Sequence, residues 1–297
     1  MKRVLGVIVF ALGATVVIGS GSATATFPGD NGRIAFYSFN TDPTRIGTVE
    51  PDGSDRLWLT AGQRNSYSPA WSADGSMIAF VKDRRASDRL LTMNADDTGG
   101  TVVFESERYR SLSDPAWSPD GSRIAFSVTP RRGPNHIAVI DVDGTGLDVI
   151  DSRLNSVGPD WSPDGTRIVF SQFGRTSLIR TMDPDGTDRE LVVEGGASPS
   201  WSPDGSHIVY SKGGRRLNVF IAGADGSDVT RLTDTPNRSE FTPAFSPDGN
   251  EIAFCRTIAN DPFSPCDIWI MGEDGTDPTR ITETPRIDEF DLSWQST

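Results

Sequence analysis

The feature that most limits how this chain can fold is a short phrase that recurs along almost its whole length. One copy reads Ala116-Trp117-Ser118-Pro119-Asp120-Gly121, and other copies keep the aromatic residue and the final Asp-Gly pair. With degenerate copies at the two ends, the aromatic positions are Phe27, Trp71, Trp117, Trp161, Trp201, Phe245 and Trp294, spaced by 44, 46, 44, 40, 44 and 49 residues. A nearly constant period of this size indicates six stacked structural units rather than unrelated domains.

Each unit has the pattern of four short strands. The phrase leads into apolar runs such as Ile124-Ala125-Phe126 and then Ile137-Ala138-Val139-Ile140, bounded by Gly, Pro and Asp. Such runs are typical of strands covered on both faces. Ser-Pro-Asp-Gly combines the fixed φ of proline with the positive φ of glycine and so predicts a tight turn, and a second Asp-Gly turn recurs later in each unit. Two hairpins per unit predict an all-β fold, a six-bladed β-propeller of four-stranded antiparallel blades without helices.

The two ends of the chain complement each other in this scheme. Residues 26–27 leave no length for an inner strand in the first blade, whereas Leu292-Ser293-Trp294 is an inner strand with no blade after it. We therefore expect the C-terminal strand to complete the first blade and close the ring.

The N-terminus has the pattern of a secretory signal peptide. Lys2 and Arg3 precede a 15-residue apolar stretch from Val4 to Ile18, and Ala23-Thr24-Ala25 forms an A-x-A cleavage site. The stretch is shorter than the ~20 residues of a membrane-spanning helix, which disfavours a retained anchor. We expect residues 1–25 to be removed, leaving a propeller domain of residues 26–297 that is secreted or periplasmic, in the cell envelope, with no membrane span.

Charge excludes one class of partner. Without Lys2 and Arg3 the mature chain has 26 basic against 41 acidic residues, a net charge of −15. Proteins that bind nucleic acids concentrate positive charge, so we expect no nucleic acid among the partners.

The repeated phrase, followed by Ile-Ala-Phe and an Asp-Gly turn, resembles the WD-like repeat of the TolB propeller family. The resemblance covers about residues 27 to 294 and concerns the propeller part of TolB, without its N-terminal α/β domain. It implies the propeller fold. It implies less about function, because the same repeat occurs in secreted binding proteins and beside the catalytic domain of some peptidases.

Candidate catalytic groups are sparse. The only histidines are His136 and His207, and the sequence has no Gly-x-Ser-x-Gly elbow, histidine-rich metal cluster or glycine-rich phosphate loop. We therefore expect a non-enzymatic, monomeric binding protein or scaffold without a cofactor. The alternative is a carbohydrate- or peptide-processing enzyme with an unrecognised site, which clustered, desolvated carboxylates on the propeller axis would favour.

One turn has the pattern of a short calcium loop. Asp183, Asp185 and Asp188 surround Gly186 and could supply oxygen ligands. Sister repeats replace the first carboxylate by Asn94, Gly223 or Gly272, and aspartate is also favoured in turns because it caps backbone amides. The loop is therefore interpreted as a structural turn, and a calcium-dependent structural propeller remains the alternative.

The two cysteines, Cys255 and Cys266, flank the segment 256–265. In an oxidising compartment a pair placed at the mouth of one hairpin is expected to form a disulfide.

Sorting the loops by face shows an asymmetry. The first and third turns of each blade carry aspartates, whereas the loops expected between the second and third strands carry basic residues. The basic residues are Arg45, Arg84, Arg85, Arg89, Arg131, Arg132, Arg175, Lys212, Arg215, Arg216 and Arg256. Arginine suits bidentate capture of carboxylate or phosphate.

The candidate ligand-binding residues are Arg84, Arg85, Arg131, Arg132, Arg175, Arg215 and Arg216. The expected partner is an envelope or extracellular protein with an acidic segment, or an anionic wall polymer. The alternative is an ordinary polar loop face whose charge Asp42, Asp83, Asp88 and Asp261 partly offset.

Overall fold

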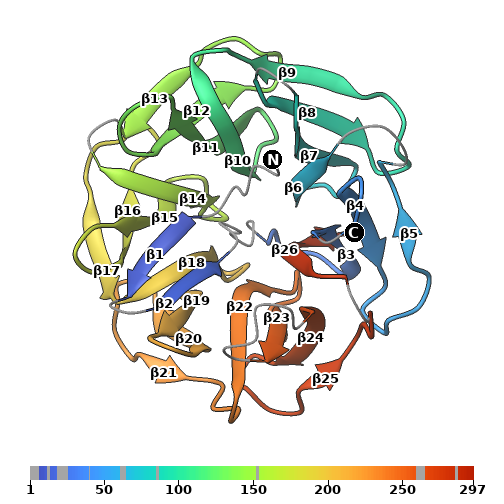
Figure 1. Ribbon diagram of the computed structural model, residues 1–297, viewed down its shortest axis with the longest axis vertical. Coiled ribbons are helices and arrows are strands. Elements are labelled where there is room, and N and C mark those ends of the chain that lie inside the picture. The colour runs from blue at the N-terminus through green and yellow to red at the C-terminus, as the bar shows by residue number, and fades with distance from the viewer. Residues whose placement is uncertain are drawn as a thin grey trace.

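Six four-stranded antiparallel sheets surround one axis (Figure 1). The computed structural model describes residues 7–11, 14–18, 26–39, 41–60, 65–84, 87–151, 154–258, 265–284 and 287–297. This part of the chain contains no helix, and accordingly none long and apolar enough to span a membrane. The predicted six-bladed β-propeller is confirmed.

The blades follow the sequence repeat, with the inner strand first in each. Blade 1 consists of β26 (Glu289–Ser296), β3 (Asn31–Ser38), β4 (Arg45–Val49) and β5 (Leu57–Trp58); blade 2 of β6 (Ser66–Trp71), β7 (Met77–Lys82), β8 (Arg89–Asn94) and β9 (Thr101–Glu105); and blade 3 of β10 (Tyr109–Trp117), β11 (Arg123–Pro130), β12 (His136–Asp141) and β13 (Asp148–Asp151).

Blade 4 consists of β14 (Asn155–Trp161), β15 (Ile168–Phe173), β16 (Leu178–Met182) and β17 (Glu190–Glu194); blade 5 of β18 (Gly196–Trp201), β19 (His207–Gly213), β20 (Leu217–Gly223) and β21 (Thr230–Arg231); and blade 6 of β22 (Arg238–Phe245), β23 (Glu251–Ile258), β24 (Asp267–Gly272) and β25 (Thr279–Arg280). A separate hairpin, β1 (Val7–Ala11) and β2 (Ala14–Ile18), falls in the segment expected to be the signal peptide.

The C-terminal strand closes the ring, as predicted. β26 pairs with β3, with Trp294 opposite Ile34 and Ser293 opposite Ala35. Trp294 is 1% exposed, and its indole Nε1 donates to the carbonyl of Gly32 at 3.0 Å. Strands 250 residues apart in sequence therefore form one blade because each alone would leave an apolar face and an unpaired edge.

A disulfide lies beside this closure. Cys255 and Cys266 are joined, and both are buried. The backbone of Cys266 accepts a hydrogen bond from the amide of Glu289 at 3.1 Å and donates one to the Asp288 carboxylate at 3.0 Å. The disulfide thus holds blade 6 next to β26, the strand that completes blade 1.

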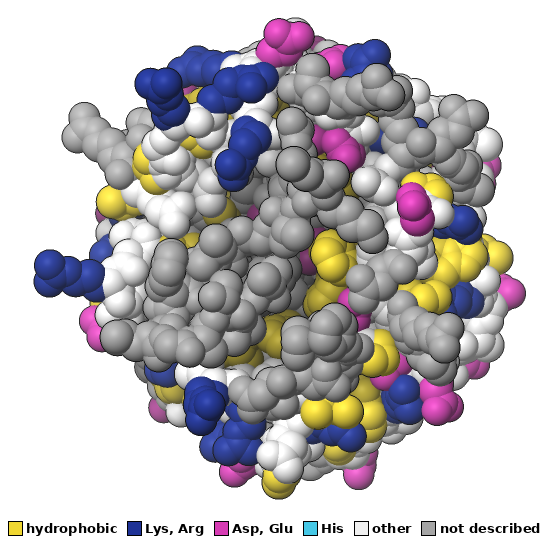
Figure 2. Space-filling view, in the orientation of Figure 1, with side chains coloured by type: hydrophobic (Ala, Val, Ile, Leu, Met, Phe, Trp, Pro, Cys, Tyr) yellow, Lys and Arg dark blue, Asp and Glu magenta, His cyan; other side chains and the backbone are white. Residues whose placement is uncertain are grey.

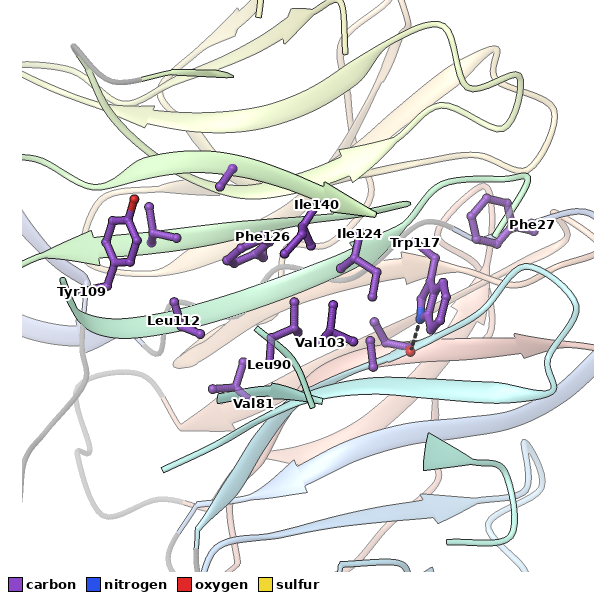
Figure 3. Close-up of a cluster of buried hydrophobic side chains, with 14 residues drawn as sticks. Phe27, Val81, Leu90, Val103, Tyr109, Leu112, Trp117, Ile124, Phe126 and Ile140 are labelled. Atoms are coloured by element: carbon purple, nitrogen blue, oxygen red, sulfur yellow. Dashed lines mark hydrogen bonds between the residues drawn. The ribbon is translucent and has the colours of Figure 1, made fainter. Parts of the chain in front are cut away.

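The first described residues after the hairpin cross the axis. Thr26 Oγ1 donates to the carbonyl of Phe245 in blade 6 at 2.6 Å. Phe27, 5% exposed, packs beside Trp117 in the apolar cluster between blades 2 and 3 (Figure 3). Blades 3 and 6 are opposite members of the ring, so residues 26–27 lie across the axis at the end where the Ser-Pro-Asp-Gly turns begin.

Every inner strand carries a bulge at the same place. The register with the second strand shifts in each blade, and the residue at the shift has positive φ. These residues are Ser68, Asp114, Gly158, Ser198, Thr242 and Asp291. A bulge redirects the side chain of the extra residue, and two of these six positions hold aspartate.

The Asp-Gly turns dock each blade onto its neighbour. A Cβ on Gly226 would lie 2.2 Å from the carbonyl oxygen of Val192, and the φ of this glycine is +85°. In blade 2 the corresponding position is Asp97, whose φ is +65°. The amide of Asp97 donates to the carbonyl of Asn94, just as the amide of Gly144 donates to the carbonyl of Asp141 in blade 3.

We expect Asp97→Gly to stabilise the protein by about 0.5–1 kcal/mol. The left-handed conformation costs a residue with a Cβ about 1–2 kcal/mol of folding free energy, and glycine removes this cost. Glycine also loses more chain entropy on folding, about 0.5–1 kcal/mol, and this loss is subtracted from the gain. Chemical denaturation of both proteins measures the difference. As the matched control, Gly226→Asp should destabilise by more than the gain at Asp97, because it adds a clash to the strain.

Candidate binding face and axial carboxylates

Most aspartates of the turn face, the face formed by the Ser-Pro-Asp-Gly and Asp-Gly turns, are used by their own turns. Ser118 Oγ donates to Asp120 Oδ1 at 2.6 Å and accepts from the Arg123 amide at 2.9 Å, while Asp120 Oδ1 accepts from the Ser122 amide at 3.0 Å. The hydrogen bond from Ser118 is the main cause that lowers the pKa of Asp120. The same network recurs around Asp74, Asp164, Asp204 and Asp248. These carboxylates stabilise their own turns.

In the loop at residues 183–188, two of the three carboxylates of the candidate calcium loop contact Arg167. Arg167 Nη1 lies 2.8 Å from Asp183 Oδ1 and 2.9 Å from Asp188 Oδ2. Asp185 Oδ1 instead accepts from the amide and hydroxyl of Thr187 at 2.9 and 2.6 Å. Across the residues that the structure describes, no group of three or more His, Cys, Asp or Glu side chains is placed to hold a metal ion.

The arginine loops lie between the second and third strands of their blades, as the sequence predicts. Arg84 is in the loop β7–β8, Arg131 and Arg132 in β11–β12, Arg175 in β15–β16, and Arg215 and Arg216 in β19–β20. We call the face formed by these four loops the basic loop face. Arg85 lies outside the described residues. Lys and Arg side chains stand around the rim of the molecule over blades 3, 4 and 5 (Figure 2).

The arginines of this face differ in their partners. Arg84 Nη1 lies 2.8 Å from Glu105 Oε1, and Arg131 Nε donates to the carbonyl of Glu107 at 2.8 Å. The other arginines are exposed and form no ion pair within the described chain. They are Arg132, Arg175, Arg215 and Arg216.

Two side chains assigned to this face from sequence are buried instead. Arg256 lies within β23, and its Nε donates to Glu240 Oε1 at 3.1 Å. Asp88 does not offset loop charge in solvent, because its Oδ2 accepts from Tyr67 Oη and Ser111 Oγ, each at 2.8 Å. Burial is the main cause that raises the pKa of Asp88. The interpretation of both as loop-face charges was wrong: β23 extends through Arg256 to Ile258, and Asp88 lies in the loop β7–β8 but is buried there.

An aromatic cluster missed by sequence reasoning lies at blade 1. The ring centroids of Tyr67 and Tyr37 are 6.4 Å apart, those of Tyr37 and Phe290 5.9 Å, and those of Phe290 and Phe39 6.3 Å. Phe39 is 42% exposed and follows β3 in the loop to β4. Hydrophobic side chains are visible near the axis over β26 and β3 (Figure 2).

Sequence reasoning also missed carboxylates on the inner strands. Asp114 in β10, Asp160 in β14 and Asp291 in β26 are all buried. Asp291 Oδ2 accepts from Ser68 Oγ at 2.8 Å, and Asp160 Oδ2 accepts from the Trp201 amide at 2.9 Å. Burial, followed by the charge of Asp114, raises the pKa of Asp291 well above its ordinary value. Aligning the residue before proline in each repeat would have placed Asp114 beside the other bulge residues, and extending the column to the proline-free last repeat would have added Asp291.

We expect Asp291→Asn to raise the melting temperature at pH 7. An ionised Asp291 destabilises the folded state because its folded pKa is raised, and this cost disappears as the pH falls through the folded pKa towards the unfolded value near 3.9. Asparagine keeps an acceptor for Ser68 without the charge. Thermal melts between pH 7 and pH 3.5 should show the gain shrinking with acidification, whereas a gain that is constant with pH would contradict this account.

Comparison with known proteins gives the family. The family model of the TolB beta propeller domain matches residues 30–240, more than half of the chain. The crystal structure of TolB from Acinetobacter baumannii has a TM-score of 0.77 at 21% identity, covering 91% of this chain and 68% of that one. At this identity the likeness shows the fold.

Two curated relatives match over shorter segments. Tol-Pal system protein TolB of Desulfosudis oleivorans is 33% identical over 70 residues, 24% of this chain and 16% of that protein. Dipeptidyl-peptidase 5 of Porphyromonas gingivalis is 36% identical over 67 residues, 20% of this chain and 10% of that protein. The chain thus matches less than a fifth of either relative's length, and these relatives include a protein named as an enzyme. The repeat, the six closed blades and the family match together show that the chain belongs to the TolB beta propeller domain family.

Proposed function

We propose that the protein is a secreted or periplasmic, non-catalytic scaffold that binds an anionic partner through its basic loop face. The partner is an envelope or extracellular protein with an acidic segment, or an anionic wall polymer. The proposed form is a monomer, without a cofactor, after removal of residues 1–25.

The difference between the two faces is the observation that carries this proposal. On the turn face, the aspartates of the repeated phrase are held by hydroxyls and amides of their own turns. On the basic loop face, Arg132, Arg175, Arg215 and Arg216 are exposed without a carboxylate partner in the described chain. Because the protein as a whole is strongly acidic, this grouping gives an anion one surface on which to approach.

The aromatic cluster supplies the apolar contact that a purely electrostatic surface lacks. Arginine and aromatic side chains dominate the binding energy of most protein interfaces. Phe39 and Phe290 lie at the end of blade 1 from which the loop β3–β4 leaves, which is the end that carries the second-to-third-strand loops. The similarity to a Tol-Pal system protein is consistent with a binding role.

Charge reversal tests the proposal. Affinity capture from envelope extract should lose its specific partner when Arg131, Arg132, Arg215 and Arg216 are all changed to Glu. The matched control changes the same four residues to Lys, which keeps the charge and should retain at least part of the binding. Unchanged capture by the Glu variant, with an unchanged melting temperature, would remove the basic loop face as the binding surface.

A carbohydrate- or peptide-processing activity is the second candidate, favoured by the buried carboxylates of the inner strands. Two carboxyl groups with different environments are the groups that acid–base hydrolysis uses. Turnover of oligosaccharide and peptide panels by the mature chain, abolished by Asp291→Asn, would support it. Equal background rates for the two proteins would reject it.

A further inference from the structure

The repeat places an arginine at the same position in three blades, and acids of the same blade hold two of the three. Arg33 in blade 1 pairs with Glu50, and Arg167 in blade 4 pairs with Asp183. Arg123 is the arginine at this position in blade 3. Across the described residues, no carboxylate lies within ion-pair distance of its guanidinium. The three blades therefore differ in how they use the same positive charge.

Two substitutions within the repeat account for this difference. In blade 4, Thr181 Oγ1 lies 3.0 Å from Arg167 Nη2 and accepts its hydrogen bond, and Asp188 Oδ2 lies 2.9 Å from Arg167 Nη1. Blade 1 has a threonine and an aspartate at the same two positions, and both contact its arginine. Blade 3 has Val139 and Gly146 there. Because valine cannot accept a hydrogen bond and glycine has no side chain, the arginine of blade 3 lacks two of the groups that bind its counterparts.

A cleft of about 610 Å³ lies beside this arginine on the turn face, between blades 3 and 4, which are neighbours in the ring (Figure 1). Arg123, Val139 and Gly146 all line it. A Cβ at Gly146 would lie 2.4 Å from Asp141 Oδ2, so a side chain at this position would narrow the cleft. The guanidinium carbon of Arg123 lies 4.9 Å from the ring centroid of Trp161, which is buried. The cation–π contact holds the guanidinium beside a cleft of the size that small ligands occupy.

Acids supply the other charges of the cleft. Asp141 lies opposite Arg123 in the β11–β12 ladder, and Asp148 is in β13. Neither acid forms an ion pair within the part of the chain that the structure describes. Asp183 and Asp185 of blade 4 also line the cleft. These acids repel a ligand that is only negative, and the arginine repels one that is only positive, so a ligand with both charges complements the lining.

We propose that this cleft binds a small zwitterion of the size of an amino acid or dipeptide. The ligand carboxylate accepts both hydrogen bonds of the guanidinium fork of Arg123. The ligand ammonium group donates to Asp141 and Asp148. The site lies on the turn face and uses no residue of the basic loop face, so it is a second binding site beyond the proposed function.

Calorimetric titration of the purified protein with L-alanyl-L-alanine should give saturable binding. Blocking either charge of the dipeptide should weaken the binding by about tenfold or more, because each contact is charge-assisted. N-acetyl-L-alanyl-L-alanine lacks the ammonium group, and L-alanyl-L-alaninamide lacks the carboxylate. Arg123→Gln should weaken binding of the dipeptide but should not weaken binding of the amide further. No saturable heat at millimolar dipeptide, or equal affinity for the dipeptide and either blocked form, would overturn the proposal.

Arg33→Gln is the matched control, because Arg33 holds the same repeat position but already has Glu50. It should leave the affinity for the dipeptide unchanged. Gly146→Asp introduces the residue that blade 4 has at this position, and the φ of +65° at Gly146 is close to the +47° of Asp188. This variant should supply Arg123 with a carboxylate of its own blade and abolish dipeptide binding. Full binding by Gly146→Asp, with an unchanged melting temperature, would overturn the proposal.

A stability measurement tests the state of Arg123 without any ligand. Arg123→Gln should shift the melting temperature by less than about 2 °C, because it breaks no ion pair. Arg167→Gln should lower the melting temperature by more, because it leaves Asp183 and Asp188 without their partner. An equal fall in the two variants would show that Arg123 is already paired and would overturn the site. Charge reversal on the basic loop face should leave all of these readings unchanged, so the two proposals fail separately.

Discussion

A mature chain that lacks residues 290–297 should have no cooperative thermal transition and should be digested rapidly by protease at 25 °C. These residues supply most of β26, which is the inner strand of blade 1 and the strand that joins the last part of the chain to the first. Leu292 and Trp294 are buried, and Ser293 Oγ accepts from the amide of Trp71 at 2.9 Å, which connects blade 1 to blade 2. Without this strand, β3 has an unpaired edge, and the apolar cluster between blades 6 and 1 loses Leu292 and Trp294.

A single substitution in β26 tests the same contact without removing the whole strand. Trp294→Ala should cost about 3–5 kcal/mol, as expected for a large aromatic side chain removed from a core. The control is Leu57→Ala in β5 of the same blade, because Leu57 is 46% exposed and its truncation should cost less than about 0.5 kcal/mol. Urea denaturation measures both. A truncated chain that melts cooperatively within a few degrees of the full mature chain would show that closure by β26 is dispensable.

Arg256→Met should destabilise blade 6 by about 3–5 kcal/mol at pH 7, because it leaves the charge of Glu240 buried and unpaired. The side chain of Glu240 is 0% exposed and that of Arg256 is 8% exposed. The guanidinium carbon lies 4.2 Å from the ring centroid of Trp269 and 5.0 Å from that of Phe254. Methionine keeps much of this apolar packing, so the loss isolates the ion pair.

The pH dependence has a definite sign. Burial raises the pKa of Glu240, and Arg256 opposes the rise. Removing Arg256 raises the folded-state pKa further, so the destabilisation should be full at neutral pH and should shrink as the pH falls towards the ordinary value near 4.3. The double variant Arg256→Met/Glu240→Gln should recover most of the loss at pH 7. Equal destabilisation at pH 7 and pH 4.5, without recovery in the double variant, would rule out the unpaired charge as the cause.

The turn chemistry explains why the sequence is so informative about the fold. In each intact phrase the serine hydroxyl and the aspartate carboxylate bond to residues within five positions of one another. Such contacts depend on local sequence alone. The number of blades could therefore be predicted from the spacing of the phrase, and the closing strand from the incomplete units at the two ends of the chain.

Whether a charged residue belongs to a candidate site depended on contacts between residues far apart in sequence. That Arg256 belongs to a buried pair rather than to a loop required knowing where β23 ends and that Glu240 lies on the facing strand. The loop arginines could be assigned to one face from the sequence, because the hairpin loop between the second and third strands of every blade lies on the same face. They are Arg131, Arg132, Arg175, Arg215 and Arg216.

The repeated phrase by itself determined the six blades and their turns, because hydrogen bonds within each turn and the apolar period of each strand are local. Its degenerate copies at the two ends of the chain determined the closure by the strand around Trp294. Only the tertiary structure decided what meets at the axis. Asp114 in blade 3 and Asp291 in blade 1 come from distant parts of the sequence, yet the charge of one raises the pKa of the other, because closing the ring brings the inner strands together around one axis.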